Sequence, residues 1–554
     1  MAGPTSPSRH SAVDPGSGYC PATRTFRSLR PHFPLPPPSL PLSVSHYALS
    51  LLPPSTSAAF LVHATSGHLL SYPDFLRRVR SLALSLQSSF SLAKGDVAFI
   101  LAPPSLHVPV VYFALLSIGV VVCPANPLSS PSEIAHQVRL CRPAIAFSTS
   151  QIAPKLPRVP HGTVLIDSPE FESMLAQYGS VPMAEAMPPN QVEQSDSAAI
   201  LFSSGTTGRV KGVLLTHRNL IVLLAGFYHL RLQRAEHEPH PVSLFVLPLF
   251  HVFGFFMLVK AFALGETAVL MERFDFVEML RAIEKYRVTK MPVSPPLIVA
   301  FVKSEIAGKY DLSSLQVLGS GGAPLGKEVA DGFRERFPHV EIVQGYGLTE
   351  TCGVGTGTLG PDEANHHGSV GRIAHHMEAK IVDPTTADAL PPGQRGELWL
   401  RGPTIMKCYV GDDKATAETI DSDGWLRTGD LCYFDSEGFL FIVDRLKELI
   451  KYKAYQVAPA ELEHLLHSNP DVADAAVIPY LDEEVGQIPM AFVVRKPGSN
   501  ITESQVMDFI SKQVAPYKKI RRVAFIGSIP KSPAGKILRR ELVDLATSVR
   551  SAKL

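Results

Sequence analysis

The sequence predicts an α/β protein with a large N-terminal domain and a small C-terminal domain. Between about residues 57 and 445, short apolar runs alternate with helical stretches, which is typical of parallel sheets with helices on their faces. Near residues 365 to 445 the pattern changes to short strands and turns, which predicts a small β subdomain. After Arg445 helix and strand patterns mix again, which predicts a compact α+β unit. A chain of 554 residues is also too long for one ordinary hydrophobic core, which favours at least two domains.

The individual elements are predicted from apolar runs and helical patterns. In the large domain, strands are expected at residues 96–102, 120–124, 144–149, 163–167, 243–248, 267–271 and 316–320, and helices near 107–118, 252–264 and 276–287. In the β subdomain, strands are expected at 396–402 and 439–444. In the last unit, a helix is expected at 459–468 and strands at 474–480 and 490–495.

The two ends of the chain differ from the rest in composition. Residues 1–45 are rich in Pro, Ser and Arg, which favours a polyproline segment or peripheral strap over a packed helix. A transit peptide is an alternative, although the prolines disfavour the helix it needs. The last residues, Ala552, Lys553 and Leu554, match the small-basic-leucine form of the peroxisomal address. We therefore expect an extension (1–45), two domains (46–444 and 445–550) and a targeting tripeptide (552–554).

Composition excludes several classes of partner. A net charge of +1 gives no electrostatic case for nucleic acid or for an acidic membrane surface. The six cysteines have no CxxC spacing, which argues against a zinc site or a disulfide framework. Residues 107–127 are nearly long and apolar enough to cross a bilayer, but Pro109, Gly119 and Pro124 interrupt them. A buried helix followed by a buried strand explains them better, so we expect no membrane span.

The most distinctive local motif is SSGTTGRVKG, at residues 203–212. Freed backbone amides, hydroxyls and a lysine together suit a cradle for polyphosphate oxygens. The residues that form this candidate cradle are Ser203, Ser204, Gly205, Thr206, Thr207, Gly208 and Lys211. It is not a Walker A loop, because Gly212 follows Lys211 where a hydroxyl residue is needed. A surface turn between a strand and a helix is the alternative interpretation.

Six motifs in a fixed order resemble those of the adenylate-forming acyl-activating enzymes. They are SSGTTGRVKG, GYGLTE (345–350), GELWLRG (396–402), GWLRTGD (424–430), VDRLKELIKYK (443–453) and KSPAGKILRREL (531–542). The resemblance covers nearly the whole chain and is greatest to plant 4-coumarate:CoA ligases and their ligase-like relatives. It implies the ANL adenylating-enzyme fold with a mobile C-terminal domain. It also implies that a small carboxylic acid, ATP, Mg²⁺ and CoA bind to the protein.

The resemblance implies a two-step reaction, in which an acyl-AMP forms and the CoA thiol then displaces AMP. Lys536 matches the mobile cation that neutralises charge on the α-phosphate, and His251 matches a histidine that positions the carboxylate. Thr349 matches an α-phosphate ligand, and Glu350 matches the carboxylate beside Mg²⁺, which would otherwise be held by phosphate oxygens and water.

Further nucleotide contacts are implied by the same motifs. Asp430 matches the carboxylate that holds the ribose hydroxyls, and Arg445 is placed to contact ribose or phosphate. The remaining matched positions are Gln344, Gly345 and Tyr346 at the adenine, with Lys447, Lys451 and Gln456 in the segment after Arg445. The C-terminal domain is expected to rotate between the two steps about a hinge at residues 444–447.

The acyl and CoA sites depart from the pattern of hydroxycinnamate-using relatives. Phe253 and Met257 stand where those relatives have a tyrosine and a serine that read the ring hydroxyl, so an aliphatic or cyclopentanone-type chain is favoured. Gly322 and Ala323 are also expected at the acyl group. Ala454 replaces a glycine in the CoA tunnel, where a methyl group can crowd the pantetheine. Lys453 and Arg273 match CoA-contacting positions.

Three alternative functions share these motifs. They are a stand-alone adenylation enzyme that serves a carrier protein, a luciferase-like oxygenase, and a non-catalytic acyl-nucleotide binding protein. The intact lysine and carboxylate positions argue against the last of these. If the peroxisomal address is used, an import receptor is a partner; the cytoplasm is the alternative location.

Overall fold

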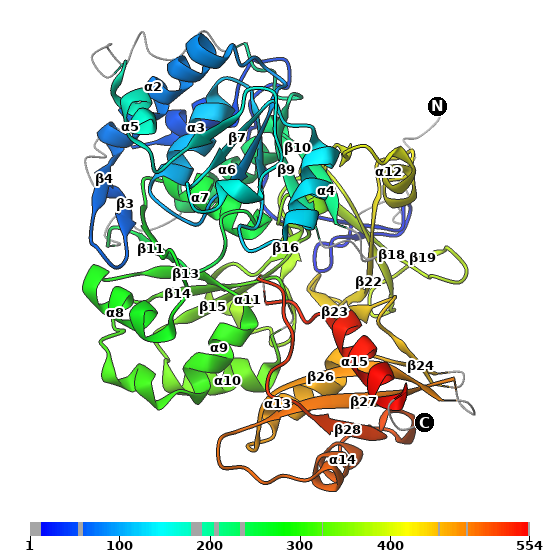
Figure 1. The fold of residues 1–554 in the computed structure, drawn as a ribbon. Coiled ribbons are helices and arrows are strands. Elements are labelled where there is room, and N and C mark those ends of the chain that lie inside the picture. Colours follow the sequence, from blue (N-terminus) through cyan, green and yellow to red (C-terminus); the bar gives the residue numbers. More distant parts are fainter. Residues whose placement is uncertain are drawn as a thin grey trace, which may run out of the picture.

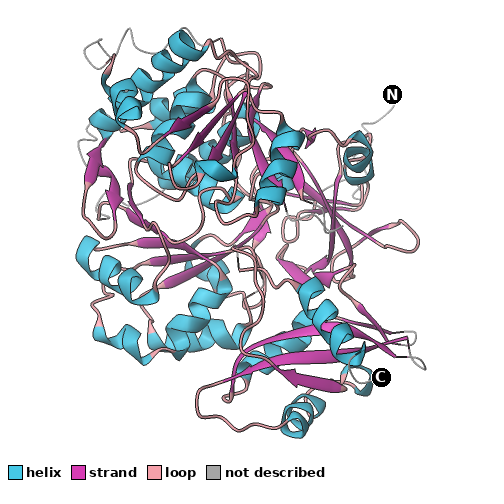
Figure 2. Ribbon diagram, in the orientation of Figure 1, coloured by secondary structure: helices cyan, strands magenta, loops and turns pink. Residues whose placement is uncertain are grey.

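The computed structural model describes residues 13–53, 59–178, 191–203, 210–232, 239–323, 325–452, 455–482, 486–533 and 535–551. The strands within these residues form four sheets, of which three belong to the N-terminal domain and one to the C-terminal domain (Figure 1). Figure 2 shows the layered helices and strands of the large domain and the strand-rich region that joins it to the small domain. The predicted α/β architecture with a β subdomain and a small α+β domain is confirmed.

The first sheet contains the strand that leads into the SSGTTGRVKG motif. Its order in space is β21 (Cys408–Tyr409), β10 (Lys211–Thr216), β9 (Ser197–Ser203), β6 (Val121–Pro124), β5 (Val97–Leu101), β7 (Ile145–Ser148) and β8 (Thr163–Leu165). β9 and β10 are antiparallel neighbours, and Lys211 pairs with Ser203. The motif therefore joins two strands, and the expected surface turn between a strand and a helix is wrong in this respect.

The second sheet is parallel through its centre. Its order is β17 (Arg372–Ile373), β16 (Thr356–Gly357), β15 (Glu341–Tyr346), β14 (Val317–Ser320), β13 (Lys290–Val293), β11 (Val242–Phe245), β12 (Thr267–Leu270), β3 (Ala59–His63) and β4 (Leu69–Ser71). The strands from β15 to β3 run parallel, so their carboxyl ends open on one edge, where ligands bind in such sheets.

The third sheet forms the β subdomain. It contains β1 (Tyr19–Cys20), β2 (Thr25–Arg27), β18 (Glu378–Val382), β19 (Ala389–Leu390), β20 (Gly396–Arg401), β22 (Leu426–Phe434) and β23 (Leu440–Arg445). β2 pairs with β18, and Phe26 is fully buried in the core of this sheet. The start of the chain thus differs from the expected peripheral extension, since residues 19–27 are part of the subdomain.

The C-terminal domain has its own sheet and core. Its strands are β24 (Ile450–Tyr452), β25 (Tyr455–Val457), β26 (Val472–Asp482), β27 (Gly486–Arg495) and β28 (Arg522–Phe525), and its helices are α13 (Pro459–Ser468), α14 (Glu503–Ser511) and α15 (Arg539–Ser551). Two apolar clusters lie within this domain. In Figure 1 the domain lies beside the green helix α10, which contacts α13.

Helices cover the sheets of the N-terminal domain. They are α1 (Val44–Leu51), α2 (Tyr72–Phe90), α3 (His107–Ser117), α4 (Pro131–Cys141), α5 (Pro169–Ala176), α6 (His217–Leu232), α7 (Val252–Ala263), α8 (Phe276–Tyr286), α9 (Pro295–Lys303), α10 (Lys327–Arg336), α11 (Gly360–Ala364) and α12 (Asp413–Thr419). α6 contacts β10, α7 contacts β12 and β13, and the two helices contact each other, so they form a layer between the first two sheets. Within the described residues, no helix is long and apolar enough to span a membrane.

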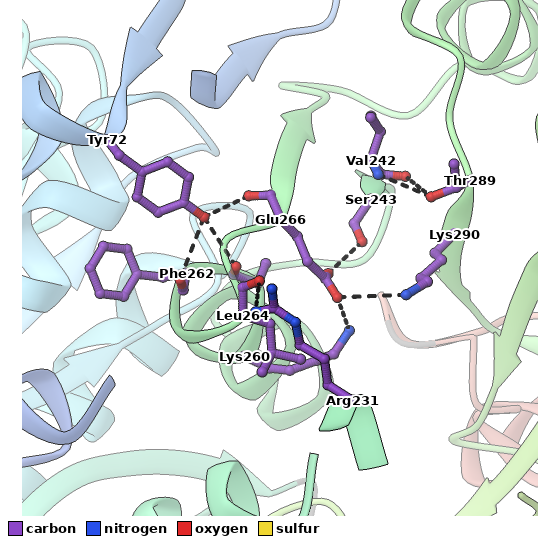
Figure 3. Close-up of polar contacts among 11 residues, drawn as sticks. Tyr72, Arg231, Val242, Ser243, Lys260, Phe262, Leu264, Glu266, Thr289 and Lys290 are labelled. Atoms are coloured by element: carbon purple, nitrogen blue, oxygen red, sulfur yellow. Dashed lines mark hydrogen bonds and ion pairs between the residues drawn. The ribbon is translucent and has the colours of Figure 1, made fainter. Parts of the chain in front are cut away.

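A buried ion-pair network fixes the carboxyl end of α7 (Figure 3). The carboxylate of Glu266 accepts a hydrogen bond from Lys260 Nζ at 2.8 Å and another from Ser243 Oγ at 2.9 Å, and Lys290 Nζ lies 3.8 Å away. Burial alone would raise the pKa of Glu266, but Lys260 and Lys290 outweigh it and hold this pKa below its usual value. Tyr72 adds a hydrogen bond from its hydroxyl to the Glu266 carbonyl at 2.7 Å. The network ties α7 to β11, β12 and β13.

Replacement of Glu266 by Gln should strongly destabilise the fold, because it leaves the buried ammonium of Lys260 without its counter-charge. Loss of one partner from a buried ion pair costs about 3–5 kcal/mol of unfolding free energy. Denaturant unfolding measures this difference. Glu278→Gln is the matched control, since Glu278 pairs with Arg281 at the surface, and it should leave the unfolding free energy unchanged. Equal effects of the two substitutions on the unfolding free energy would contradict the assignment of Glu266 as the buried counter-charge of Lys260.

Candidate functional site

A cleft of about 1820 Å³ lies between the two domains. It is lined by residues from all three N-terminal sheets and from the segment 531–541 of the C-terminal domain. Many predicted site residues meet there: Ser203, Lys211, His251, Gly322, Ala323, Gly345, Tyr346, Thr349, Glu350, Asp430, Arg445, Lys447 and Lys536. The fold therefore brings together most of the predicted site residues that the structure describes.

The floor of the cleft contains a buried carboxylate, Asp430. Asp430 on β22 faces Arg445 on β23 as a cross-strand pair, with Arg445 Nε 3.4 Å from Asp430 Oδ1. The hydroxyl of Tyr346 donates a hydrogen bond to the other carboxylate oxygen at 2.5 Å. Burial raises the pKa of Asp430, while Arg445 and Tyr346 oppose this shift. The carboxylate is thus oriented from two sides before any ligand binds.

Lys536 enters the cleft from a tight turn of the C-terminal domain. The N–H of Ser532 donates to the carbonyl of Lys536 at 2.8 Å, and the N–H of Gly535 donates to the carbonyl of Ser532 at 2.8 Å. Gly535 has a φ of +81°, and a Cβ there would lie 2.9 Å from Ser294 Oγ of the N-terminal domain. Glycine is therefore required by both conformation and proximity.

The pKa of the Lys536 side chain depends on charged groups of both domains. Burial and then Arg445 lower the pKa of Lys536, while Glu350 and Asp430 oppose them. The ammonium accordingly lies among two carboxylates and one guanidinium, and these carboxylates come from strands and turns far from it in sequence. An anionic ligand in this position would meet a cation that is partly withdrawn from water, where charge interactions are stronger.

Glu350 and Lys211 meet at a residue that the motifs did not identify, Tyr409. The hydroxyl of Tyr409 donates to Glu350 Oε1 at 2.8 Å, and Lys211 Nζ lies 4.3 Å from the centroid of the Tyr409 ring. Tyr409 belongs to β21, which adds to β10 beside Lys211. Its role depends on this long-range strand pairing, and the preceding sequence IMKC contains no signal for it.

Ser203 and His251 offer polar atoms to the cleft. Within the part of the chain that the structure describes, Ser203 Oγ is buried without a hydrogen-bond partner. His251 caps the start of α7, and its Nδ1 accepts from the N–H of Phe253 at 3.4 Å. Burial, together with Lys536, lowers the pKa of His251 to about 4. The imidazole is therefore neutral near pH 7, with Nε2 as its hydrogen-bond donor.

The predicted acyl residues Phe253 and Met257 do not line the cleft, but Phe253 lies against the segment that carries Gly322. Its ring is within 3.3 Å of a Cβ placed on Gly321, the residue before Gly322, and stacks on Phe256 with 5.6 Å between centroids. Phe256 in turn packs against Gly353, where a Cβ would lie 2.5 Å from the ring. Met257 packs against the same apolar core. The packing next to Gly321 is thus apolar.

The remaining predicted residues lie outside the cleft in this domain arrangement. Gln344 is buried in β15, where its N–H donates to Thr358 Oγ1 at 2.9 Å. Arg273 is exposed after β12, and Lys451 and Gln456 form an exposed cross-strand pair of β24 and β25. The structure does not bring these four positions to the nucleotide side of the cleft. Ser204, Gly205, Thr206, Thr207, Gly208, Lys453, Ala454 and the terminal tripeptide lie outside the described residues.

Comparison with known proteins agrees with this geometry. Residues 54–410 match the family of AMP-binding enzymes, and residues 461–536 match the AMP-binding enzyme C-terminal domain. The chain is 60% identical to 4-coumarate–CoA ligase-like 9 of Arabidopsis thaliana, over 98% of each chain. It is 45% identical to peroxisomal OPC-8:0-CoA ligase 1 of the same plant, over 97% of this chain and 99% of that protein.

The solved structure of ATP-bound MatB from Rhodopseudomonas palustris superposes with a TM-score of 0.80. It covers 92% of this chain and 100% of that one at 24% identity, so the likeness is one of fold. The predicted ANL fold and the predicted family are both confirmed. The chain belongs to the AMP-binding enzyme family and, within it, to the 4-coumarate–CoA ligase-like proteins.

Proposed function

We propose that this protein is an ATP-dependent acid–thiol ligase that makes an acyl-CoA in two steps. In the first step, a carboxylate oxygen attacks the α-phosphorus of ATP and pyrophosphate leaves. In the second step, the thiol sulfur of CoA attacks the acyl carbon and AMP leaves. The observation that supports this most strongly is the meeting of Lys536, Asp430, Glu350 and Lys211 in one cleft. Relatives of near full-length similarity carry names of CoA ligases.

In the first step, charge on the phosphates has to be neutralised as pyrophosphate leaves. Lys536 is placed to act on the α-phosphate and Lys211 on the departing pyrophosphate. Thr349 and Ser203, whose hydroxyl has no hydrogen-bond partner among the described residues, would supply hydrogen bonds to phosphate oxygens. The neutral imidazole of His251 can donate to the acyl carboxylate without pairing with it as a cation.

The nucleotide is oriented by the carboxylate on the cleft floor. Asp430 accepts hydrogen bonds from the ribose hydroxyls, and Tyr346 and Arg445 hold this carboxylate in place. Gly345 and Tyr346, which line the cleft, are assigned to the adenine side. Glu350 is a hard oxygen ligand for Mg²⁺, which would take its other ligands from phosphates and water and supply charge stabilisation. A single protein carboxylate is enough for a Mg²⁺ ion that is held mainly by phosphates and water. The described residues contain no cluster of metal-binding side chains.

The second step needs a different domain arrangement. CoA is proposed to contact Arg273, Lys453 and the backbone at Ala454, and Arg273 is exposed and free of the cleft here. The proposed hinge, residues 444–447, covers the last two residues of β23 and the first two of the link to β24. Rotation about it would withdraw Lys536 and bring the segment with Lys451 and Gln456 to the cleft.

The proposed acid has an aliphatic or oxylipin chain. Phe253 lies against Gly321, the residue before Gly322 and Ala323, and Phe253 and Met257 offer no partner to a phenolic hydroxyl. A relative at 45% identity is named for its action on OPC-8:0 and for the peroxisome. The terminal Ala-Lys-Leu supports the same compartment for this protein.

Replacement of Lys536 by Ala should lower the rate of acid-dependent ATP–pyrophosphate exchange at least about 100-fold, because the charge on the α-phosphate is no longer neutralised. Thiolysis of supplied acyl-AMP by CoA should remain close to the wild-type rate. Lys512→Ala, at an exposed lysine of the same domain, is the control and should leave both rates unchanged. Equal loss of both half-reactions in Lys536→Ala would refute the role. Adenylate formation without transfer to free CoA would instead favour a carrier-dependent enzyme.

The apolar side chains of Phe253 and Met257 predict which acids are the better substrates, and a panel of acids can test this ranking. Octanoate and a cyclopentanone-bearing fatty acid should give higher kcat/KM for CoA-dependent AMP formation than 4-coumarate. The double variant Phe253→Tyr, Met257→Ser should shift the ratio toward 4-coumarate by roughly 10-fold or more, since the phenol gains hydrogen-bond partners. A wild-type preference for 4-coumarate, with no change in the double variant, would contradict the assignment.

A further inference from the structure

Helix α9 contacts the C-terminal domain at both of its ends. At its start, Ser294 lies against Gly535 in the turn that carries Lys536. At its end, Lys303 Nζ donates hydrogen bonds to the carbonyls of Val472 at 2.7 Å and Ala473 at 3.3 Å. The helix has nine residues, so the two contacts are about 13 Å apart along its axis. Two separated contacts restrict the orientation of a domain more than one contact would, and the contact between α10 and α13 adds to them.

The acceptors of Lys303 are exposed by an irregularity in β26. The pairing of β26 with β27 shifts register between Val472 and Asp474, so Ala473 is an extra residue in the strand. Such a bulge bends the strand and turns its backbone groups away from the regular ladder. Two successive carbonyls then point at one ammonium group, and hydrogen bonds from a charged donor are stronger than neutral ones.

Neighbouring cations of the C-terminal domain are paired within their own domain. Lys531 Nζ lies 2.6 Å from Asp474, and Arg539 Nε lies 2.7 Å from Glu448. Lys303 differs from them because it belongs to the N-terminal domain and its acceptors belong to the C-terminal domain. Its hydrogen bonds therefore exist only while the two domains are docked as they are here.

We infer that Lys303 is a positioning residue that latches the C-terminal domain in the arrangement that places Lys536 in the cleft. This inference rests on the proposed function, in which that arrangement serves adenylate formation and must be left for thioester formation. Lys303 touches neither ATP nor the acid, and its contribution is the bias that it gives to one domain arrangement.

The test compares the two half-reactions in Lys303→Met, which keeps the aliphatic length and removes the donors. Acid-dependent ATP–pyrophosphate exchange should fall roughly 5- to 150-fold, the usual range for coupling between two sites. Thiolysis of supplied acyl-AMP should be at least as fast as in the wild type. The acid and the acyl-AMP are those that the wild type turns over fastest among octanoate, 4-coumarate and the cyclopentanone-bearing acid.

The deciding quantity is the ratio of the exchange rate to the thiolysis rate, because it does not depend on the fraction of enzyme that is folded. Lys303→Arg retains donors on a long side chain and should restore much of the ratio. Lys309→Met, at an exposed lysine shortly after α9, should leave the ratio at the wild-type value. An unchanged ratio in Lys303→Met would overturn the latch. A wild type that catalyses no exchange with any acid would overturn the proposed function itself, which is a separate outcome.

Discussion

The structure depends on one electrostatic arrangement: an ammonium of the C-terminal domain lies among charges of the N-terminal domain. Burial and then Arg445 lower the pKa of Lys536, while the carboxylates of Glu350 and Asp430 oppose this shift. A cation that is partly withdrawn from water is costly unless such carboxylates accompany it. The cleft is therefore complete only when the domains are docked, and the position of the small domain decides which chemistry the cleft can support.

The large domain supports this arrangement by fixing its polar groups in advance. Asp430 is oriented by a cross-strand guanidinium and by the hydroxyl of Tyr346. Helix α7, which begins at the cleft with His251, is anchored at its other end by Glu266 and Lys260. The buried residues Glu266 and Lys260 hold α7 in place, so the site keeps its geometry. The residues that line the cleft remain open to ligands.

Regular periodicity allowed much of the fold to be predicted. The buried strands at residues 97–101 and 267–270 and the helix at 252–263 occur where apolar patterns indicated them. The strands at residues 19–20 and 25–27 were not predicted, because two or three residues in a Pro- and Ser-rich segment carry no period. They are stabilised instead by pairing: β1 pairs with β2, and β2 pairs with β18, more than 300 residues away in sequence.

The residues of the candidate site also fall into two groups, those that the sequence predicted and those that it did not. Asp430, Glu350 and Lys536 lie in short motifs whose spacing is visible in the sequence, and the fold brings them together. Tyr409 and Lys303 were missed because each works through a contact that only tertiary structure creates, with Lys211 and Glu350 in one case and with β26 in the other. Lys451 and Gln456 lie away from the cleft in this domain arrangement, and the proposed domain rotation would bring them to it.

The role of Asp430 in an adenylate site is tested most directly by binding measurements. AMP and 2′,3′-dideoxy-AMP are each bound to the wild type and to Asp430→Asn, and the affinities are compared. If Asp430 holds the ribose hydroxyls, the wild type should prefer AMP by roughly 10-fold or more, since a buried carboxylate loses its partners with the dideoxy nucleotide. The Asn variant should lose most of that preference. An equal preference for AMP in both proteins would contradict the assignment of this cleft as an adenylate site.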